Sequence, residues 1–430
     1  PPVRCPLPAL RLPPALRPMP APSEPDDLTP GEPVGPEQLR PFRVGSSWRD
    51  GAGETLSSTH PGDASLVAVI GRASLRDVDD AVAVAHAAFR ASGWRQARPD
   101  ERATVYPRIA ERIDGDGEAL ARWLMLDSGE PLARSHAIVA DAARGFRYHA
   151  ALCETWQDEV TSRSETALSL TLAEPWGVVA AITSATAPLQ AAVRKLAPAL
   201  AAGNAVILKP SEETPLMALE LARLASEAGL PDGLLTVLPG DGPEIGAALV
   251  KHPDVRLASF SGTRLTGRSV ATTAGNRLIP AVLALGGRSA QLIFDDARLE
   301  EALDAVATAA FESRDRGAIT GPRLFIQKSV YGRFVEALVL RAKGFAVGLP
   351  ADPQTRIGPL VSRTHQVRAL RALDVARGEG AKVLAGGKAP DAPALARGCF
   401  LLPTVLEGLG HSARLCREEG VGPIVACPPF

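Results

Sequence analysis

Residues 174–215 indicate the fold and read EPWGVVAAITSATAPLQAAVRKLAPALAAGNAVILKPSEETP. Two short apolar runs, at 176–184 and 204–211, flank a segment with helical spacing of apolar residues that stops at Gly203. This order predicts a strand, a helix and a second strand. Because parallel strands need a long return connection, the unit predicts a parallel sheet.

The same alternation continues along the chain. TPLMALELARLASEAG is helix-like and ends at Gly229, and LLTVLPG, GPEIGAALVKH and RLASFSG repeat the pattern. A second series follows Gly287 with SAQLIF, LEEALDAVATAAFES, RLFIQ and VYGRFVEALVLRAKGF. We therefore predict an α/β protein with a doubly wound, Rossmann-like sheet and a second α/β domain.

Composition excludes several classes of protein. The chain has 430 residues, 46% of them hydrophobic, with a net charge of −1 and basic and acidic residues alternating, so a nucleic-acid partner is not expected. The longest apolar stretch, GVVAAITSATAPLQAAV, is interrupted by Thr, Ser and Pro and is shorter than twenty residues, so no membrane helix is expected. The seven histidines show no metal-ligand spacing. The cysteines are dispersed without a CxxC pair, which favours a reducing compartment and a cytoplasmic location; they are Cys5, Cys153, Cys399, Cys416 and Cys427.

Three segments stand apart from the βα pattern. Residues 1–41 are rich in proline and are predicted to be a disordered tail or linker. Two amphipathic helices are predicted at about 100–128 and 131–156, and SETALSLTLAEP (164–175) predicts an inserted hairpin arm. The sequence shows neither an initiating Met nor a leader pattern, so its targeting is left open.

Polar groups follow the predicted strands at the edge where open parallel sheets bind ligands. Lys209 and Glu212, in LKPSEETP, come just after a strand and have the chemistry to reach ribose hydroxyls or a phosphate. A solvated, salt-bridged turn explains them equally well.

Two glycine-rich turns lie at the same edge. PGDGPEIG contains Gly242 and Gly246 at a strand-to-helix turn and suits close backbone approach to a ligand, although its spacing is not GxGxxG. FSGTRLTG places Gly262, Thr263 and Gly267 at the start of a helix, where Thr263 can bind a phosphate or act only as an N-cap.

These blocks together resemble the aldehyde dehydrogenase superfamily. The similarity runs from about Phe42 to about residue 425, in eight blocks that occur in the family's order: EPWGVVAAIT, LAPALAAGNAVILKPSEETPL, EAGLPDGLLTVLPG, FSGTRLTG, LALGGRSAQLIF, DPQTRIGPL, GCFLLPTV and REEGVGPIV. The resemblance implies an aldehyde-dehydrogenase-like fold with a Rossmann-like NAD(P)-binding domain, a catalytic α/β domain and a small β oligomerisation arm. The implied segments are a tail (1–41), a nucleotide-binding domain (42–156 and 174–284), an arm (157–173) and a catalytic-type domain (285–430).

The resemblance also implies a cofactor and its contacts. Family members oxidise aldehydes to acids with NAD or NADP, and Lys209, Glu212 and Thr263 match the residues that contact the cofactor. Glu419 matches the glutamate that holds the nicotinamide ribose. Glu212 favours NAD by bonding the ribose 2′-hydroxyl, but NADP stays open, and Val421 in place of the family's Phe weakens the pocket.

The catalytic positions implied by the resemblance carry no catalytic groups. The family's nucleophilic Cys falls on Ala318, its general base Glu on Ala284, and its oxyanion-binding Asn on Thr186. A methyl group cannot attack a carbonyl, and the loss of one oxyanion donor alone costs roughly 2.7–4 kcal/mol. Thr320 is close in sequence but has no adjacent base, and the cysteines are interpreted as buried or incidental thiols.

Three interpretations follow. The first is a non-catalytic member of the superfamily that serves as a scaffold or regulatory subunit. The second is an active NAD(P)⁺-dependent oxidoreductase that uses an unrecognised nucleophile or the intact site of a partner, and the third is a cofactor-binding sensor. The expected partners are other aldehyde-dehydrogenase-like subunits, although family subunits continue well beyond the block that ends this chain at Phe430, so the catalytic-type domain is expected to be incomplete.

Overall fold

The computed structural model describes most of the chain. The described residues are 38–430, apart from 52–53, 165, 288, 313–322 and 420–421. Leu39–Arg40 form strand β1, which pairs in parallel with β5 (Leu66–Gly71). Residues 39–40 of the predicted disordered tail or linker (1–41) are therefore part of a strand.

A five-stranded parallel sheet is formed by strands that lie between Val178 and Leu285 in the chain. Its spatial order is β10-β9-β8-β11-β12. The strands are β8 (Val178–Ile182), β9 (Ala205–Lys209), β10 (Leu235–Val237), β11 (Val255–Gly262) and β12 (Ala281–Leu285). Strands β8 and β9 are buried along their whole length, which explains why their sequences are continuous apolar runs.

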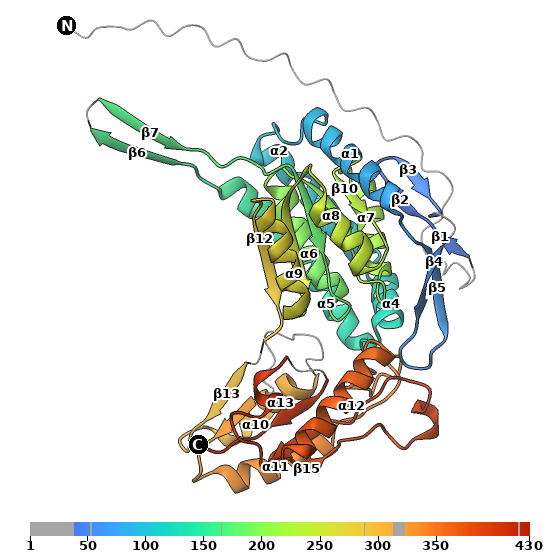
Figure 1. Cartoon of the computed structure of the whole chain (residues 1–430), viewed down its shortest axis with the longest axis vertical. Coiled ribbons are helices and arrows are strands. Elements are labelled where there is room, and N and C mark those ends of the chain that lie inside the picture. Colours follow the sequence, from blue (N-terminus) through green and yellow to red (C-terminus); the bar gives the residue numbers. More distant parts are fainter. Residues whose placement is uncertain (1–37, 52–53, 165, 288, 313–322, 420–421) are drawn as a thin grey trace, which may run out of the picture. The chain divides into compact units, whose positions relative to one another are not determined.

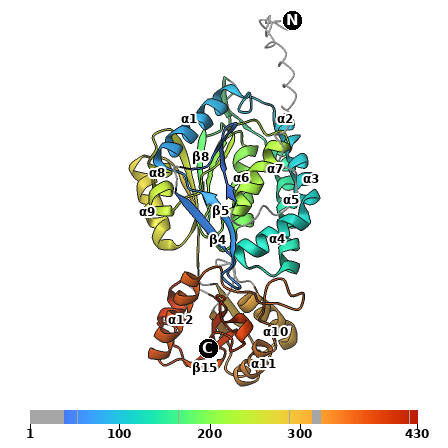
Figure 2. The same cartoon turned by 90° about the vertical axis from the view of Figure 1, so that its right-hand side faces the viewer.

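Helices cover both faces of this sheet (Figure 2). One face carries α1 (Leu75–Ala91), α8 (Ala247–Lys251) and α9 (Arg264–Asn276), and the other carries α6 (Pro188–Ala201) and α7 (Leu216–Glu227). The chain passes from β8 through β9 to β10 on one side and returns to β11 and β12 on the other. The predicted doubly wound, Rossmann-like sheet is confirmed.

A helical layer packs outside α6 and differs in part from the prediction. The predicted helix at 100–128 is three helices, and the longer helix at 131–156 is present almost as expected. The elements are α2 (Pro99–Ala103), α3 (Val105–Gly115), α4 (Gly117–Ser128) and α5 (Leu132–Thr155). The break at Asp116 lies between Gly115 and Gly117, and glycine is a poor helix former.

The second half of the protein contains another five-stranded sheet, in the order β13-β14-β17-β16-β15. Its outer strands β13 and β15 are labelled in Figure 1. Only the pair β15 and β16 is antiparallel. The strands are β13 (Ala290–Ile293), β14 (Arg323–Ile326), β15 (Lys382–Ala385), β16 (Thr404–Glu407) and β17 (Ile424–Ala426), and the helices are α10 (Leu299–Ala307), α11 (Tyr331–Lys343), α12 (Arg363–Gly378) and α13 (Arg414–Arg417). Its core includes Leu324, Phe334, Leu338 and Val405, all essentially inaccessible to solvent.

Small β elements complete the described part of the chain. Strands β2 (Phe42–Val44), β3 (Ser47–Arg49) and β4 (Thr55–Thr59) come first among these in the chain, and β6 (Glu159–Ser164) and β7 (Ala167–Thr171) form an antiparallel hairpin. This hairpin occupies the place of the predicted arm (Figure 1). Every residue of β7 is exposed, including Leu168 and Leu170.

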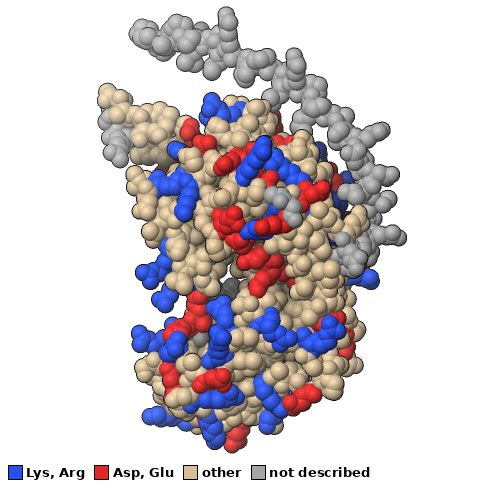
Figure 3. All heavy atoms as spheres, turned by 45° about the vertical axis from the view of Figure 1, so that its right-hand side comes forward, with Lys and Arg blue, Asp and Glu red and all other residues tan. Residues whose placement is uncertain are grey.

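Charged side chains of both signs are interspersed over the face shown in Figure 3. Several form ion pairs, such as Arg341 with Glu300 and Asp304. Among the described helices, none combines the length and apolar character needed to cross a bilayer.

One carboxylate lies inside the first half of the protein. Asp127, near the end of α4, is fully buried. It accepts a hydrogen bond from the Ser58 hydroxyl at 2.7 Å and one from the backbone N–H of Leu216 at 3.1 Å. Burial raises the pKa of Asp127 to about 7, although both hydrogen bonds and the charge of Arg40 oppose the shift. The network links β4, α4 and the start of α7.

Candidate functional site

The predicted site begins where β9 ends. Lys209 is the last residue of β9, and only 2% of its surface is exposed. Its Nζ donates a hydrogen bond to Glu212 Oε2 at 3.1 Å, and the Glu212 side chain is 43% exposed. Burial lowers the pKa of Lys209 below its usual range, and the Glu212 carboxylate opposes that shift. The pair therefore presents a buried ammonium behind a solvent-accessible carboxylate.

The first glycine-rich turn lies beside this pair. Asp241 caps a π-turn (Gly242–Gly246) by accepting a hydrogen bond from the Glu244 N–H at 2.7 Å. The Arg72 guanidinium donates a hydrogen bond to Asp241 Oδ2, also at 2.7 Å. A Cβ added to Gly246 would lie 3.7 Å from Lys209 Cδ, so the turn contacts the lysine stem. The structure thus brings Lys209, Glu212 and Gly246 together, with Gly242 at the open start of the same turn.

The second glycine-rich turn opens α9. Thr263 is the N-cap of α9 and accepts from the Thr266 N–H at 3.4 Å, so the predicted N-cap role is present. A Cβ at Gly262 would come within 2.5 Å of the Phe260 ring, and one at Gly267 within 2.4 Å of Leu285. Larger residues at either position would force these neighbours to move, which explains the two glycines without any ligand.

The strand register places both groups at one edge of the sheet. Ile182, at the end of β8, pairs with Lys209 on one side and with Phe260 on the other. Lys209 and Phe260 are therefore two strand spacings apart, roughly 10 Å. The chain reverses its direction of strand addition between β8 and β11, and open parallel sheets bind ligands at the carboxyl ends of strands at such a point.

Glu419 reaches this edge from the second half of the chain. The backbone N–H of Arg264, the first residue of α9, donates to Glu419 Oε1 at 2.8 Å. A Cβ at Gly286 would lie 3.1 Å from Glu419 Cδ, so the carboxylate is closely packed against the end of β12. The sequence places Glu419 at a ribose contact by resemblance, but it contains no signal for this bond between residues 155 positions apart.

The positions expected for chemistry are only partly within the described residues. Ala284 lies on β12 opposite Ser261 and is exposed, and Thr186 is half-buried in the loop between β8 and α6. Ala318, Thr320 and Val421 lie outside the described residues. At Ala284 and Thr186, the side chains present a methyl group and a hydroxyl where the resemblance requires a carboxylate and an amide.

The three cysteines whose pKa is shifted show no sign of activation as nucleophiles. Cys153, Cys399, Cys416 and Cys427 are buried. Burial raises the pKa of Cys153 and of Cys399 and raises the pKa of Cys427 to about 12. Because the thiolate is the nucleophile, these three environments disfavour the reactive form.

Lys195 is a buried titratable group that the sequence analysis does not single out. It lies on α6 with 7% of its surface exposed, and its Nζ donates to the Ser259 hydroxyl at 2.9 Å. Burial lowers the pKa of Lys195 to about 8. A helical wheel would have placed Lys195 on the buried face, since it follows Pro188 by seven residues and Ala192 by three.

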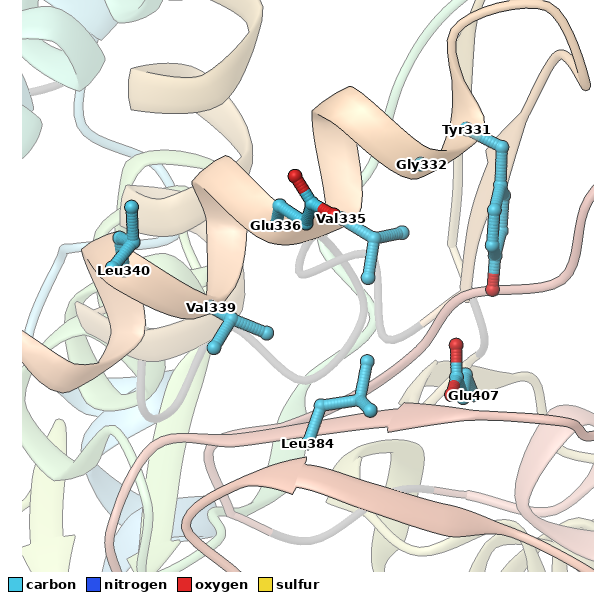
Figure 4. A pocket seen from close by; sticks show the side chains of 8 residues that line it. All are labelled: Tyr331, Gly332, Val335, Glu336, Val339, Leu340, Leu384 and Glu407. Atoms are coloured by element: carbon cyan, nitrogen blue, oxygen red, sulfur yellow. The ribbon is translucent and has the colours of Figure 1, made fainter.

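A cavity of about 450 Å³ lies elsewhere, between α11 and the strands β15 and β16 (Figure 4). Val335, Val339 and Leu384 point into it, and Tyr331 and Glu407 stand at one end. The Tyr331 hydroxyl donates to the Cys427 carbonyl at 2.9 Å, and Glu407 pairs with Lys382 at 3.1 Å. None of the predicted site residues lines this cavity.

Comparisons with known proteins agree with the resemblance. The sequence model of the aldehyde dehydrogenase family matches residues 48–430. Betaine aldehyde dehydrogenase from Staphylococcus aureus, solved in complex with NAD⁺, superimposes with a TM-score of 0.88 and 33% identity over 91% of this chain and 78% of that chain. PnpE, solved in complex with nicotinamide adenine dinucleotide, gives a TM-score of 0.87 and 37% identity over 91% of this chain and 80% of the other.

Proposed function

The chain belongs to the aldehyde dehydrogenase family. We propose that it binds NAD or NADP but does not oxidise aldehydes. Its role is then that of a scaffold or regulatory subunit. The observation that carries the proposal is the contrast at one sheet edge: Lys209 and Glu212 are paired and in place, whereas Ala284 presents a methyl group on β12. The residues proposed to bind the cofactor are thus present, whereas the position that the resemblance matches to the general base carries no carboxylate.

The described residues fit a dinucleotide. Lys209 supplies a charged donor and Glu212 an exposed acceptor for ribose hydroxyls, and the start of α9 supplies backbone N–H groups for a diphosphate. When bound, the nicotinamide would supply a hydride acceptor. Glu212 supports NAD over NADP, because its carboxylate would repel a 2′-phosphate.

The proposal is tested by binding and turnover measured on the same preparation. NAD⁺ should raise the melting temperature in a titration, since a ligand that binds only the native state stabilises it by RT ln(1 + [L]/Kd). Incubation with NAD⁺ and a panel of aldehydes should produce no NADH above a boiled control, and Ala318→Cys alone should not restore turnover because Ala284 supplies no base. A flat thermal response over millimolar NAD⁺ would exclude binding, and native turnover would exclude the non-catalytic role.

The alternative is an active oxidoreductase that relies on an unrecognised nucleophile or on a partner's intact site. Retention of the Lys209 and Glu212 pair favours it to the same degree as it favours simple binding. A thiol-reactive aldehyde analogue mapped by mass spectrometry discriminates between the two. If none of the five cysteines is modified, the version with an unrecognised thiol nucleophile is excluded.

Glu419 is expected to compete with a bound diphosphate. Its carboxylate already accepts from the Arg264 N–H at the start of α9, where the helix dipole favours an anion. Glu419→Gln should therefore tighten the binding of ADP by about 2- to 10-fold. ADP is the informative probe because it has no nicotinamide ribose, so the family's ribose contact cannot contribute. Equal or weaker ADP binding by the variant, in isothermal titration, would contradict the competition.

We also propose that the hairpin β6–β7 joins this chain to other aldehyde-dehydrogenase-like subunits in the cytoplasm. Four apolar side chains of the hairpin region are more than half exposed: Val160, Leu168, Leu170 and Leu172. Light scattering of the wild type and of Leu168→Ser/Leu170→Ser tests the association. An unchanged mass would argue against a role for this surface.

A further inference from the structure

Two lysines are buried in the first half of the protein, and their partners differ. Lys209 Nζ faces the Glu212 carboxylate at 3.1 Å, whereas Lys195 Nζ donates to the neutral Ser259 hydroxyl at 2.9 Å. Among the described residues, no carboxylate forms an ion pair with Lys195. A counter-charge stabilises an ammonium, and a neutral hydroxyl does so far less. Of the two buried lysines, Lys195 is therefore the one that loses its proton more easily to give the uncharged amine.

The amine lies at the inner margin of an exposed face of the sheet. Ser259, its partner on β11, pairs in register with Val282 on β12, and Ser261 pairs with Ala284 two residues further on. Paired residues of a parallel sheet share a face and alternate residues return to it, so these four side chains lie on the face that carries Lys195. Val282 is 56% exposed and Ala284 is also exposed. The sheet face that carries Ser259 is thus exposed to solvent at β12, one strand away from the partner of Lys195.

We propose that Lys195 captures small aldehydes as a Schiff base. The Nζ lone pair forms a C–N bond to the carbonyl carbon, the carbonyl π electron pair moves to oxygen, and one proton passes from the nitrogen to that oxygen to give a carbinolamine. Loss of water then gives the imine. Nothing is oxidised or reduced, so the step needs no nucleotide and is reversible. The chain would in this way hold an aldehyde without converting it.

The electrostatics of Lys195 agree with this role. Because its pKa is lowered to about 8, a substantial fraction of the amine is uncharged at neutral pH. An ordinary lysine, with a pKa near 10.4, has on the order of one uncharged amine in a thousand at pH 7.5. The uncharged fraction of Lys195 is therefore about 100-fold larger than that of an ordinary lysine. This excess can outweigh the slower access of an aldehyde to a buried amine.

The test is reductive trapping. The full chain is incubated with propanal and sodium cyanoborohydride, digested and mapped by mass spectrometry. Alkylation of Lys195 should proceed at least tenfold faster than that of Lys209 or of the exposed Lys251, and its rate should rise with a midpoint near pH 8. Lys195→Met should remove the fast label.

Two results would overturn the proposal. One is labelling spread over exposed lysines with Lys195 no faster than Lys251, and the other is no labelling of Lys195 at all. The mapping on the wild type is decisive even if Lys195→Met fails to fold. Because trapping is done without nucleotide, its failure leaves the proposed NAD(P) binding intact, and a failure of nucleotide binding leaves the capture intact.

Discussion

Lys209→Met is expected to weaken NAD⁺ binding by about 10- to 100-fold, the cost of one or two hydrogen bonds from a charged donor. Methionine keeps most of the buried stem that contacts Gly246 but cannot donate to a ribose hydroxyl or a phosphate. The Glu212 carboxylate left behind is 43% exposed and can be hydrated, so the fold should tolerate the change. Isothermal titration with NAD⁺ measures the loss.

Lys251→Met is the matched control. Lys251 is an exposed lysine at the end of α8, a helix that covers the same sheet, so its removal changes the net charge equally without touching the site. The control should bind NAD⁺ as the wild type does. If Lys209→Met binds as tightly as Lys251→Met while both melt like the wild type, then Lys209 is only a structural lysine and the proposed site is in the wrong place.

Asp127→Asn is expected to stabilise the protein at alkaline pH. The folded pKa of Asp127 is about 7, above the value near 3.9 of an unfolded chain, so the folded state holds a proton that the unfolded state has lost. The free energy of unfolding therefore falls as pH rises from about 4 to 7, by roughly 4 kcal/mol in all. Asparagine is never charged and keeps hydrogen-bonding capacity towards Ser58 and the Leu216 N–H.

Urea denaturation at two pH values measures this effect. The stability gained by Asp127→Asn should be about 2 to 3 kcal/mol larger at pH 8 than at pH 5. Asp296→Asn, at an exposed aspartate, serves as the control and should show no such dependence. A gain that does not change with pH would mean that the Asp127 carboxyl does not retain its proton on folding.

Local sequence patterns predicted most of the first sheet. Strands β8 and β9 are continuous apolar runs, and α6 lies between them with apolar residues at helical spacing and Gly203 just beyond its end. The patterns were less reliable where one helix gives way to the next. The segment at 100–128 keeps helical periodicity through Gly115 and Gly117, so its division into α2, α3 and α4 is not visible in the spacing of apolar residues alone.

The candidate site was predicted in part. Lys209 and Glu212 follow a strand directly, and a strand that ends a βαβ unit places them at the ligand edge of the sheet. Lys195 was missed because a single lysine in a helix is normally exposed, and only the packing of α6 on the sheet shows that it faces Ser259. Asp127 was missed for the same reason in α4.

Residue types and their spacing along the chain were sufficient for the alternation of strands and helices in the first sheet, for the family, and for the identity of the groups at Ala284 and Thr186. Which charged and polar groups contact one another could be seen only in the folded structure. Glu419 meets the Arg264 N–H across 155 residues, and Lys195 and Lys209 receive different partners on neighbouring elements. Electrostatic environment depends on distance and burial in space, and neither quantity is carried by local sequence.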